Sequence, residues 1–324
     1  MEIRALNIDD DLELTAAYLV ECAANQNSRP DWKPLSKEAR MLSWRASDGW
    51  RNHLVGAWDD SKLLGFAAGM NHADTPETTW VFSWVEPDEQ RSGIGSALVR
   101  TVESTSQSST TRFTASIFRP ETAQIDQVAR DFLQPLGYAP ATTETVVELD
   151  LSVVSLPEPR TIEGYEINTY VNGVPERYRE QVGRIKGLVD SEAPNGDLDW
   201  NESPVSPEEY ADEISLWKAQ EFTVLETIAI TPEGAVAAWT CLLVPVHPAI
   251  PAQVEGTLVV SAHRGHALGF AVKLDNLRCA LAETEVEKVR TSSDDENVWM
   301  RSINSALGFE PVETEMILQK KTCK

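Results

Sequence analysis

The stretch Gln90-Arg91-Ser92-Gly93-Ile94-Gly95 follows an apolar run, Thr79 to Val85, and precedes a segment in which Leu98, Val99 and Val102 have helical spacing. A strand that ends in a glycine-bearing turn and then opens a helix brings several backbone N–H groups together. These donors and the positive end of the helix attract phosphate, and glycine lets the anion approach the backbone closely. The stretch therefore predicts an anion site between a strand and a helix.

A related stretch, Arg264-Gly265-His266-Ala267-Leu268-Gly269, lies in the second half of the chain, and Gln90 and Arg264 are 174 residues apart. Each half also has a later Leu-Gly-aromatic ending, Leu136 to Tyr138 and Leu307 to Phe309, at an offset of 171. Two landmarks with nearly the same offset predict a duplicated domain. A single turn of this kind is more often only a glycine-containing helix start, but two at matching places favour the anion site.

Two other phosphate-binding motifs fit less well. The dinucleotide motif needs a third glycine where Leu98 stands and an acidic residue about 20 positions later. The Walker loop needs Gly-Lys-Ser or Gly-Lys-Thr, which the sequence lacks.

The domain boundary is expected where the pattern restarts. Val146 to Leu151 reads as a closing strand, and Pro157 and Pro159 cannot continue regular pairing. We therefore expect a first domain at 1–151, a linker at 152–163 and a second domain at 164–324.

Both domains read as a mixed α/β fold, in which helices cover a sheet. The expected strands are 2–6, 52–58, 63–70, 79–86, 112–118 and 143–150, then 165–171, 222–230, 235–245, 252–260, 287–292 and 312–319. The expected helices are 10–24, 35–45, 94–106 and 124–134, then 175–189, 207–218, 268–283 and 297–306.

Composition limits the class of protein. The 324 residues are 42% hydrophobic, and 28 basic against 51 acidic side chains give a net charge of −23. Such acidity disfavours nucleic acid as a partner, and no apolar run is long enough to span a membrane. An acidic surface attracts protonated amines, although solubility alone explains it equally well. The acidic N-terminus and four widely spaced cysteines indicate a reducing cytoplasm, with no signal peptide and no cysteine-based metal site.

The two glycine-rich stretches resemble the pyrophosphate loop of the GNAT superfamily of acyl-CoA N-acyltransferases, whose pattern is Gln/Arg-x-x-Gly-x-Gly/Ala. The second departs from it at Ala267, where the first glycine of the pattern is expected. The second half is also similar to bacterial tandem GNAT proteins. The residues that carry this similarity are His263 to His266, Val272 to Arg278, Asn297, Met300, Asn304 and the segment 192–200.

This resemblance implies two GNAT domains in tandem, each with a mixed, splayed sheet that holds acetyl-CoA as cosubstrate and binds no metal. The strand ends at Val85, or at Val259 with Val260, would offer backbone groups to the pantetheine arm and an N–H to the thioester oxygen. Ordinary burial in a strand explains these valines as well. The residues implied at the cofactor are Val85, Gln90, Arg91, Ser92, Gly93, Ile94, Gly95 and Ser96, then Val259, Val260, Arg264, Gly265, His266, Ala267, Leu268, Gly269, Phe270 and Asn297.

The superfamily often uses a glutamate on the fourth strand as base and a tyrosine four residues before the Leu-Gly glycine as acid. The first domain has neither, and Leu133 occupies the tyrosine position. The second domain has Glu255, four residues before Val259 and so expected on the same strand face. Its tyrosine position is Asn304, which can form hydrogen bonds but cannot donate a proton as an acid. A solvated edge carboxylate is the alternative account of Glu255.

Less specific roles are favoured for the other candidate site residues. His263 and His266 lie inside the loop, where phosphate contact is favoured over catalysis, and Cys279 has no histidine partner that would support acyl-cysteine chemistry. The stretch 190–213 contains nine acids with Trp200 and Tyr210 among them. This stretch reads either as a solvated loop or as a lid for a cationic amine.

We therefore expect an acetyl-CoA-dependent N-acetyltransferase that transfers the acetyl group directly to a small primary amine in a ternary complex. The second domain would be catalytic and the first catalytically degenerate. Two alternatives stay open, namely a CoA-binding pseudoenzyme that acts as a sensor or scaffold, and N-acetylation of proteins. The sequence does not identify the acceptor amine or the oligomeric state.

Overall fold

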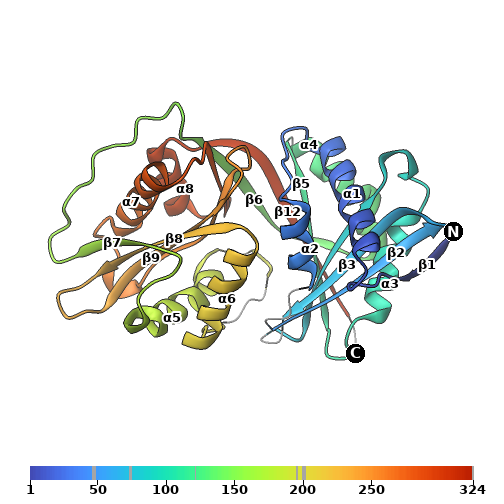
Figure 1. Cartoon of the computed structure of the whole chain (residues 1–324), viewed down its shortest axis with the longest axis horizontal. Coiled ribbons are helices and arrows are strands. Elements are labelled where there is room, and N and C mark those ends of the chain that lie inside the picture. Colours follow the sequence, from blue (N-terminus) through green and yellow to red (C-terminus); the bar gives the residue numbers. More distant parts are fainter. Residues whose placement is uncertain (46–48, 73–74, 121, 195, 199–201, 323–324) are drawn as a thin grey trace. The chain divides into compact units, whose positions relative to one another are not determined.

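The computed structural model describes residues 1–45, 49–72, 75–120, 122–194, 196–198 and 202–322. The chain forms two compact units: unit 1 contains residues 1–144 and 313–324, and unit 2 contains residues 145–312 (Figure 1).

Unit 1 is a mixed sheet with helices on both faces, and its strand order is β1-β2-β3-β4-β5-β12. Strands β4 and β5 are parallel, and the other pairs are antiparallel. Its strands are β1 (Glu2–Ala5), β2 (Trp50–Asp59), β3 (Lys62–His72), β4 (Thr78–Val85), β5 (Arg112–Arg119) and β12 (Glu310–Lys321). Its helices are α1 (Asp11–Ser28), α2 (Lys37–Arg45), α3 (Ile94–Thr105) and α4 (Thr122–Val128). The helix expected at 124–134 changes after Val128 into a π-helical segment, Ala129–Leu133.

Unit 2 repeats this arrangement with the strand order β6-β11-β10-β9-β8-β7, and β10 and β11 are its parallel pair. Its strands are β6 (Ala139–Asp150), β7 (Glu166–Val171), β8 (Phe222–Ile230), β9 (Val236–Pro245), β10 (Ala252–Val259) and β11 (Lys288–Asp294). Its helices are α5 (Glu176–Glu192), α6 (Pro207–Ala219), α7 (Leu268–Glu283) and α8 (Val298–Leu307). The expected mixed α/β class and the expected strands agree with this structure, and α7 has the expected bounds.

Each sheet buries side chains on both faces because successive strand residues point to opposite sides. In unit 1, Leu54 packs with α1 and α2, whereas the next residue, Val55, packs with α3 and α4. In unit 2, α5 and α6 cover one face, and α7 and α8 cover the other.

The two units exchange their closing strands. The second half of β6 lies in unit 2 beside β11, where Leu149 and Leu151 enter the core. The second half of β12 lies in unit 1 beside β5, where Met316 and Leu318 enter the core. The expected division at 151 and 164 therefore differs from the compact units. That division assumed that each half closes its own sheet.

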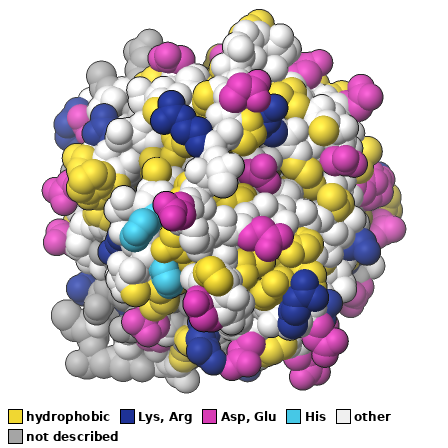
Figure 2. All heavy atoms as spheres, turned by 90° about the vertical axis from the view of Figure 1, so that its left-hand side faces the viewer, with side chains coloured by type: hydrophobic (Ala, Val, Ile, Leu, Met, Phe, Trp, Pro, Cys, Tyr) yellow, Lys and Arg dark blue, Asp and Glu magenta, His cyan; other side chains and the backbone are white. Residues whose placement is uncertain are grey.

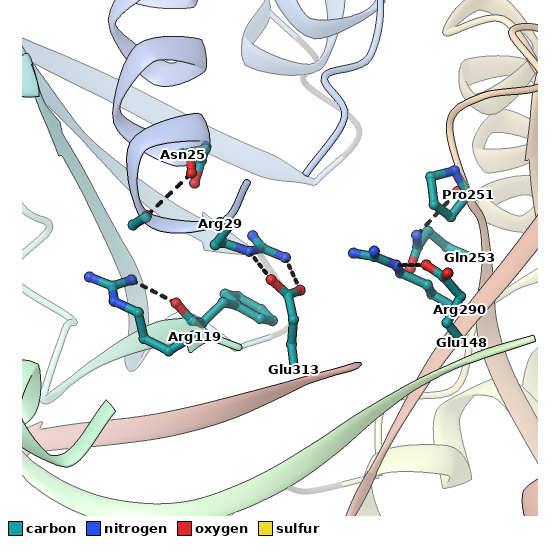
Figure 3. A network of polar contacts seen from close by, with 10 residues as sticks. Asn25, Arg29, Arg119, Glu148, Pro251, Gln253, Arg290 and Glu313 are labelled. Atoms are coloured by element: carbon teal, nitrogen blue, oxygen red, sulfur yellow. Dashed lines mark hydrogen bonds and ion pairs between the residues drawn. The ribbon is translucent and has the colours of Figure 1, made fainter. Parts of the chain in front are cut away.

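A charged pair holds each exchanged strand in its host unit (Figure 3). The Arg29 guanidinium donates to both carboxylate oxygens of Glu313 in β12, at 2.7 and 2.5 Å. In unit 2, Arg290 Nε donates to Glu148 of β6 at 2.7 Å. Lys288 and Arg290 both bind Glu148 and hold the pKa of its carboxyl below its usual value against the effect of burial. Such charge-assisted bonds have a strict geometry and so specify the position of each strand.

A buried polar cluster fixes α6 on the sheet of unit 2. The Tyr210 hydroxyl donates to Glu226 of β8 and accepts the N–H of Val174 at 2.7 Å. Trp239 Nε1 donates to the second oxygen of Glu226 at 2.8 Å. Because Tyr210, Glu226 and Val174 are all almost fully buried, no solvent can replace these bonds.

The substitution Tyr210→Phe should therefore destabilise unit 2 by about 2 kcal/mol, because it leaves a buried carboxylate and a buried N–H each without one partner. The midpoint of urea unfolding measures this effect. Tyr170→Phe, which removes the hydroxyl of a half-buried tyrosine on β7, is the matched control and should change stability by less than about 0.5 kcal/mol. Equal midpoints for the two variants would contradict the role assigned to Tyr210.

Candidate functional site

In each unit the central parallel strands pair over only a few residues. Strands β4 and β5 pair at Thr78, Thr79 and Trp80 of β4, and β10 and β11 pair at Ala252 and Gln253 of β10. No further pairs between these strands occur in the described part of either unit. The later backbone groups of β4 and β10 therefore have no partner strand on that side, and a bound molecule can pair with them.

The turns that follow β4 and β10 have matching hydrogen bonds. Gln90 Nε2 donates to the Val85 carbonyl at 3.0 Å, and Arg264 Nε donates to the Val259 carbonyl at 3.2 Å. Both donors and both acceptors are 174 residues apart, as the sequence alignment of the two halves requires. The side chains of Gln90 and Arg264 thus brace the turn against the strand.

The two loops also share one backbone conformation. Positive φ angles occur at Arg91 (64°) and Gly93 (90°), and at the matching positions Gly265 (85°) and Ala267 (55°). Each loop therefore has glycine at only one of its two left-handed positions. In unit 2 the N-cap residue of α7 is Ala267, which adopts a left-handed conformation that is strained for an L-residue. The missing glycine noted in the sequence is compatible with an intact loop.

The first turns of α3 and α7 present unpaired N–H donors. Gly93 and Ala267 are the N-caps of these helices, and neither provides a side-chain hydrogen bond. The N–H groups of residues 94–96 and 268–270 thus converge where each loop ends, as the sequence predicts for a phosphate site. A Cβ atom at Gly93 or Gly265 would meet no atom within 4 Å, so the outer side of both loops is open.

The last glycine of each loop has a second reason to be glycine. A Cβ atom at Gly95 would lie 3.2 Å from the Phe132 ring, and one at Gly269 would lie 3.1 Å from Ile303 Cδ1 and 3.4 Å from Val259 Cγ2. A larger residue at either position would require the neighbouring side chain to shift by a few tenths of an ångström. The sequence reasoning attributed these glycines to phosphate approach alone.

The end of β10 directs one N–H group toward the unpaired side. Val260 N–H donates to the Ala237 carbonyl of β9 at 2.9 Å, so it is not available to a thioester oxygen as the resemblance implied. Neighbouring strand residues direct their N–H groups to opposite sides. Val259 N–H therefore points toward the side where β11 no longer pairs.

Glu255 lies in a β-bulge. Val254 pairs with Leu242 and Gly256 pairs with Cys241, so Glu255 is the additional residue of β10, and it is exposed. The bulge interrupts the alternation of side chains along β10. The four-residue spacing between Glu255 and Val259 therefore does not place them on one strand face, contrary to what was expected. Bulges re-aim side chains and occur often beside active sites.

Asn304 is buried without hydrogen-bond partners. Asn304 is 2% exposed. Neither its amide nitrogen nor its amide oxygen forms a hydrogen bond with any group that the structure describes. An unsatisfied buried amide costs about 1–3 kcal/mol, so its retention indicates a partner that the described residues do not supply. Leu133, at the matching place in unit 1, is an ordinary core residue.

The remaining predicted residues have structural partners. His263 Nδ1 lies 3.0 Å from the Tyr165 hydroxyl, and His266 Nδ1 lies 3.2 Å from the His263 carbonyl oxygen. Asn297 caps α8 by accepting the Met300 N–H at 3.1 Å. Phe270 packs partly buried against the core beneath α7.

The acidic stretch 190–213 is not a free set of carboxylates. Glu192 binds Arg264 of the loop, Glu213 binds the buried Lys186 of α5, and Tyr210 lies in the core. Trp200 lies outside the described residues. The face of the molecule in Figure 2 has acidic side chains distributed among small groups of Lys and Arg rather than one continuous charged patch.

Lys273 is a candidate that the sequence reasoning missed. It is 3% exposed on α7, one helical turn after Gly269. One signal in the sequence could have identified it, because the helical spacing of the segment predicts an apolar residue at position 273.

In the described part of the chain, no group of three or more His, Cys, Asp or Glu side chains is arranged to bind a metal. Over the same residues, no helix combines the length and apolar character that crossing a bilayer demands.

Comparison with known proteins gives a family match for part of the chain and a fold for the whole of it. Residues 17–138 match the profile of the acetyltransferase (GNAT) family. No curated protein sequence matches significantly. A tandem GNAT protein from the clavulanic acid biosynthesis pathway is 21% identical, with 100% of this chain and 99% of that chain covered and a TM-score of 0.80. A GCN5-related N-acetyltransferase from Sphaerobacter thermophilus is 18% identical, with 99% and 95% covered and a TM-score of 0.68.

A third solved structure contains a glucosamine N-acetyltransferase region within a fungal multi-domain β-N-acetylglucosaminidase. It is 15% identical, with 98% of this chain and 38% of that chain covered and a TM-score of 0.65. These similarities confirm the resemblance to tandem GNAT proteins and the predicted fold class.

The left-handed residue at the start of α7 gives a direct test of the loop conformation. Ala267→Gly should stabilise the protein by about 0.5–1 kcal/mol, because glycine adopts this φ without strain. Ala280→Gly, in the middle of the same helix, should instead destabilise it by about 1 kcal/mol. Unfolding midpoints measure both effects. Destabilisation by Ala267→Gly would contradict the assigned conformation.

Proposed function

We propose that this chain, whose residues 17–138 match the GNAT family and whose fold is that of tandem GNAT proteins, transfers the acetyl group of acetyl-CoA to a small primary amine in the cytoplasm. The observation that carries the proposal is the pair of matching loops. Each places unpaired helix N–H groups beside the end of a strand that has lost its parallel neighbour. The CoA phosphates bind these N–H groups, and the pantetheine arm pairs with the free edge of the strand.

We assign the reaction to unit 2. The acceptor amine attacks the acetyl carbon, the C–S bond breaks, and the CoA thiolate leaves with the electron pair. Val259 N–H donates to the oxygen that becomes negative during attack. Glu255, exposed in the bulge of β10, takes the proton from the amine directly or through water. The buried Asn304 amide of α8 has no hydrogen-bond partner among the described residues, and we assign it a polar contact with the thioester.

Unit 1 has a different surface at the corresponding strand. Its β4 carries a stack of aromatic rings, with Trp80 and Phe82 centroids 6.2 Å apart and Phe82 and Trp84 centroids 5.9 Å apart. No carboxylate occurs on this strand, and Leu133 replaces the polar residue of α8. Unit 1 therefore binds CoA without catalysing the transfer in this proposal.

The acceptor is a cationic amine in this proposal because the chain carries a net charge of −23. The fungal neighbour is described as a glucosamine N-acetyltransferase region, and an amino sugar belongs to the same chemical class. The alternative, a CoA-binding sensor without turnover, is favoured by the absence of a tyrosine at position 304.

Matched loop variants test which units bind CoA and which catalyses. Ser92 and His266 occupy the same exposed loop position in the two units. Ser92→Glu and His266→Glu should each lower CoA affinity at one site at least tenfold, because a carboxylate repels the pyrophosphate. Calorimetric titration with CoA should show up to two sites in the wild-type protein and one fewer in each variant.

Only His266→Glu should stop acetyl-CoA-dependent thiol release with a panel of primary amines. Loss of turnover in Ser92→Glu alone would assign catalysis to unit 1. A wild-type protein that binds no CoA would overturn the proposal as a whole.

Removal of the base tests the mechanism. Glu255→Gln should lower turnover by about 10²–10⁴-fold at neutral pH while CoA affinity stays within twofold. The loss should shrink at high pH, where more of the amine is already unprotonated. Glu287→Gln, at another exposed carboxylate of unit 2, is the control and should be silent. An unchanged rate for Glu255→Gln would show that water accepts the proton.

A further inference from the structure

Unit 2 contains a buried amine that has no charged partner in the part of the chain that the structure describes. The Lys273 ammonium lies 3.9 Å from the Met300 sulfur and 5.6 Å from the centroid of the Phe309 ring. Burial alone lowers the pKa of this amine from 10.5 to about 7.

The charged groups of the neighbouring elements are engaged elsewhere. Arg290 of β11 binds Glu148, and Asp275 of α7 accepts from the Thr169 hydroxyl at 2.7 Å. Arg301 of α8 donates to the Asp295 carbonyl at 2.8 Å. Within the described residues, no carboxylate compensates the charge of Lys273.

The matching position in unit 1 shows that packing does not require a lysine. The loop offset of 174 places Lys273 at Val99, and the helix offset of 171 places Asn304 at Leu133. Val99 and Leu133 both lie in the apolar core of unit 1. Unit 2 therefore carries a buried amine and a buried amide where unit 1 has two hydrocarbons. Burying such groups without partners costs stability, so their presence calls for a functional reason.

Both groups belong to helices that meet at the end of β10. Gly269 approaches Val259 of β10 and Ile303 of α8 closely, so these three elements meet there. Lys273 follows Gly269 by one helical turn on the same face of α7, and its contact Met300 precedes Asn304 by one turn on α8. The amine and the amide thus lie on facing helices next to the strand end that would hold the thioester.

We propose that Lys273 gives the proton to the departing CoA thiolate, with the Asn304 amide as a hydrogen-bond donor to the same sulfur. This inference rests on the proposed function and supplies the acid that position 304 cannot provide. The acceptor amine forms the C–N bond and loses one proton to Glu255 or water. The C–S bond breaks, the sulfur receives a proton from the Lys273 ammonium, and solvent restores that proton. The products are the N-acetyl amine and CoA thiol. An acid whose pKa lies near the working pH is well suited to this step.

The thiol of bound CoA provides a test that needs no acceptor. Ultraviolet absorbance of the thiolate is titrated in the CoA complexes of the wild-type protein and of Lys273→Met. A CoA thiolate beside Lys273 keeps the lysine protonated, and the ammonium in turn stabilises the thiolate, so Lys273 should lower the thiol pKa. In Lys273→Met the thiolate should therefore be protonated at a pH about one unit higher. Lys218→Met, at an exposed lysine of α6, is the control and should titrate like the wild-type protein.

Turnover gives a second readout with the amine panel. Lys273→Met should lower turnover at least tenfold at neutral pH, with the KM for acetyl-CoA within twofold, and should remove the alkaline limb near pH 7 from the rate profile. Identical thiol titrations in wild-type and Lys273→Met complexes, with CoA binding intact, would overturn this inference alone. Absence of CoA binding in the wild-type protein would overturn the proposed function and this inference together.

The free energy of unfolding of Lys273→Met shows that the variant folds. Its dependence on pH reports the protonation state of the Lys273 amine. The unfolded chain binds the lysine proton up to about pH 10.5, whereas the folded protein releases it near pH 7. Lys273 should therefore make the wild-type protein increasingly stable as the pH rises from 7 to 10.5, and Lys273→Met should lose this slope. A slope that persists in Lys273→Met would overturn the assignment of a neutral buried amine.

Discussion

The early end of parallel pairing between the two central strands of each unit is the constraint on which the rest of the site depends. Because β11 stops pairing with β10 after Gln253, the backbone of the following residues has no neighbour on one side. The bulge at Glu255, the N–H of Val259 and the turn at Arg264 all lie along this unpaired edge. A continuous parallel pair would satisfy the same groups and leave none for a substrate.

Local signals in the sequence were sufficient for the elements and the loops. Helical and strand periodicity predicted α7 at its observed bounds, and the two offsets predicted matching loops, which the bonds of Gln90 and Arg264 confirm. Partners distant in sequence could not be predicted this way. The pairing of β12 with β5 depends on contacts such as Arg29 with Glu313, and no local pattern specifies them. Similarly, Tyr210 looked like part of an acidic lid, because its partner Glu226 belongs to another strand.

The repeats have diverged most at the contact between the loop helix and the helix that follows it. The backbone of the two loops is nearly the same, down to the two left-handed residues in each. The interface beneath the loops differs in kind, with Val99 and Leu133 in unit 1 and Lys273 and Asn304 in unit 2. Retention of the binding loop with a changed interior is consistent with one unit that holds a cofactor and another that also performs chemistry.

The exchange of closing strands affects how the protein is made. Strand β12 follows every element of unit 2 along the chain, yet it forms hydrogen bonds with β5 of unit 1. A ribosome that has synthesised the whole of residues 1–144 has therefore not yet supplied the last strand of that unit, and β5 has an open edge during translation. Open edges invite pairing with other chains. Unit 1 can complete its fold only after unit 2 has been synthesised, so the two halves of this duplicated chain must mature together rather than one after the other.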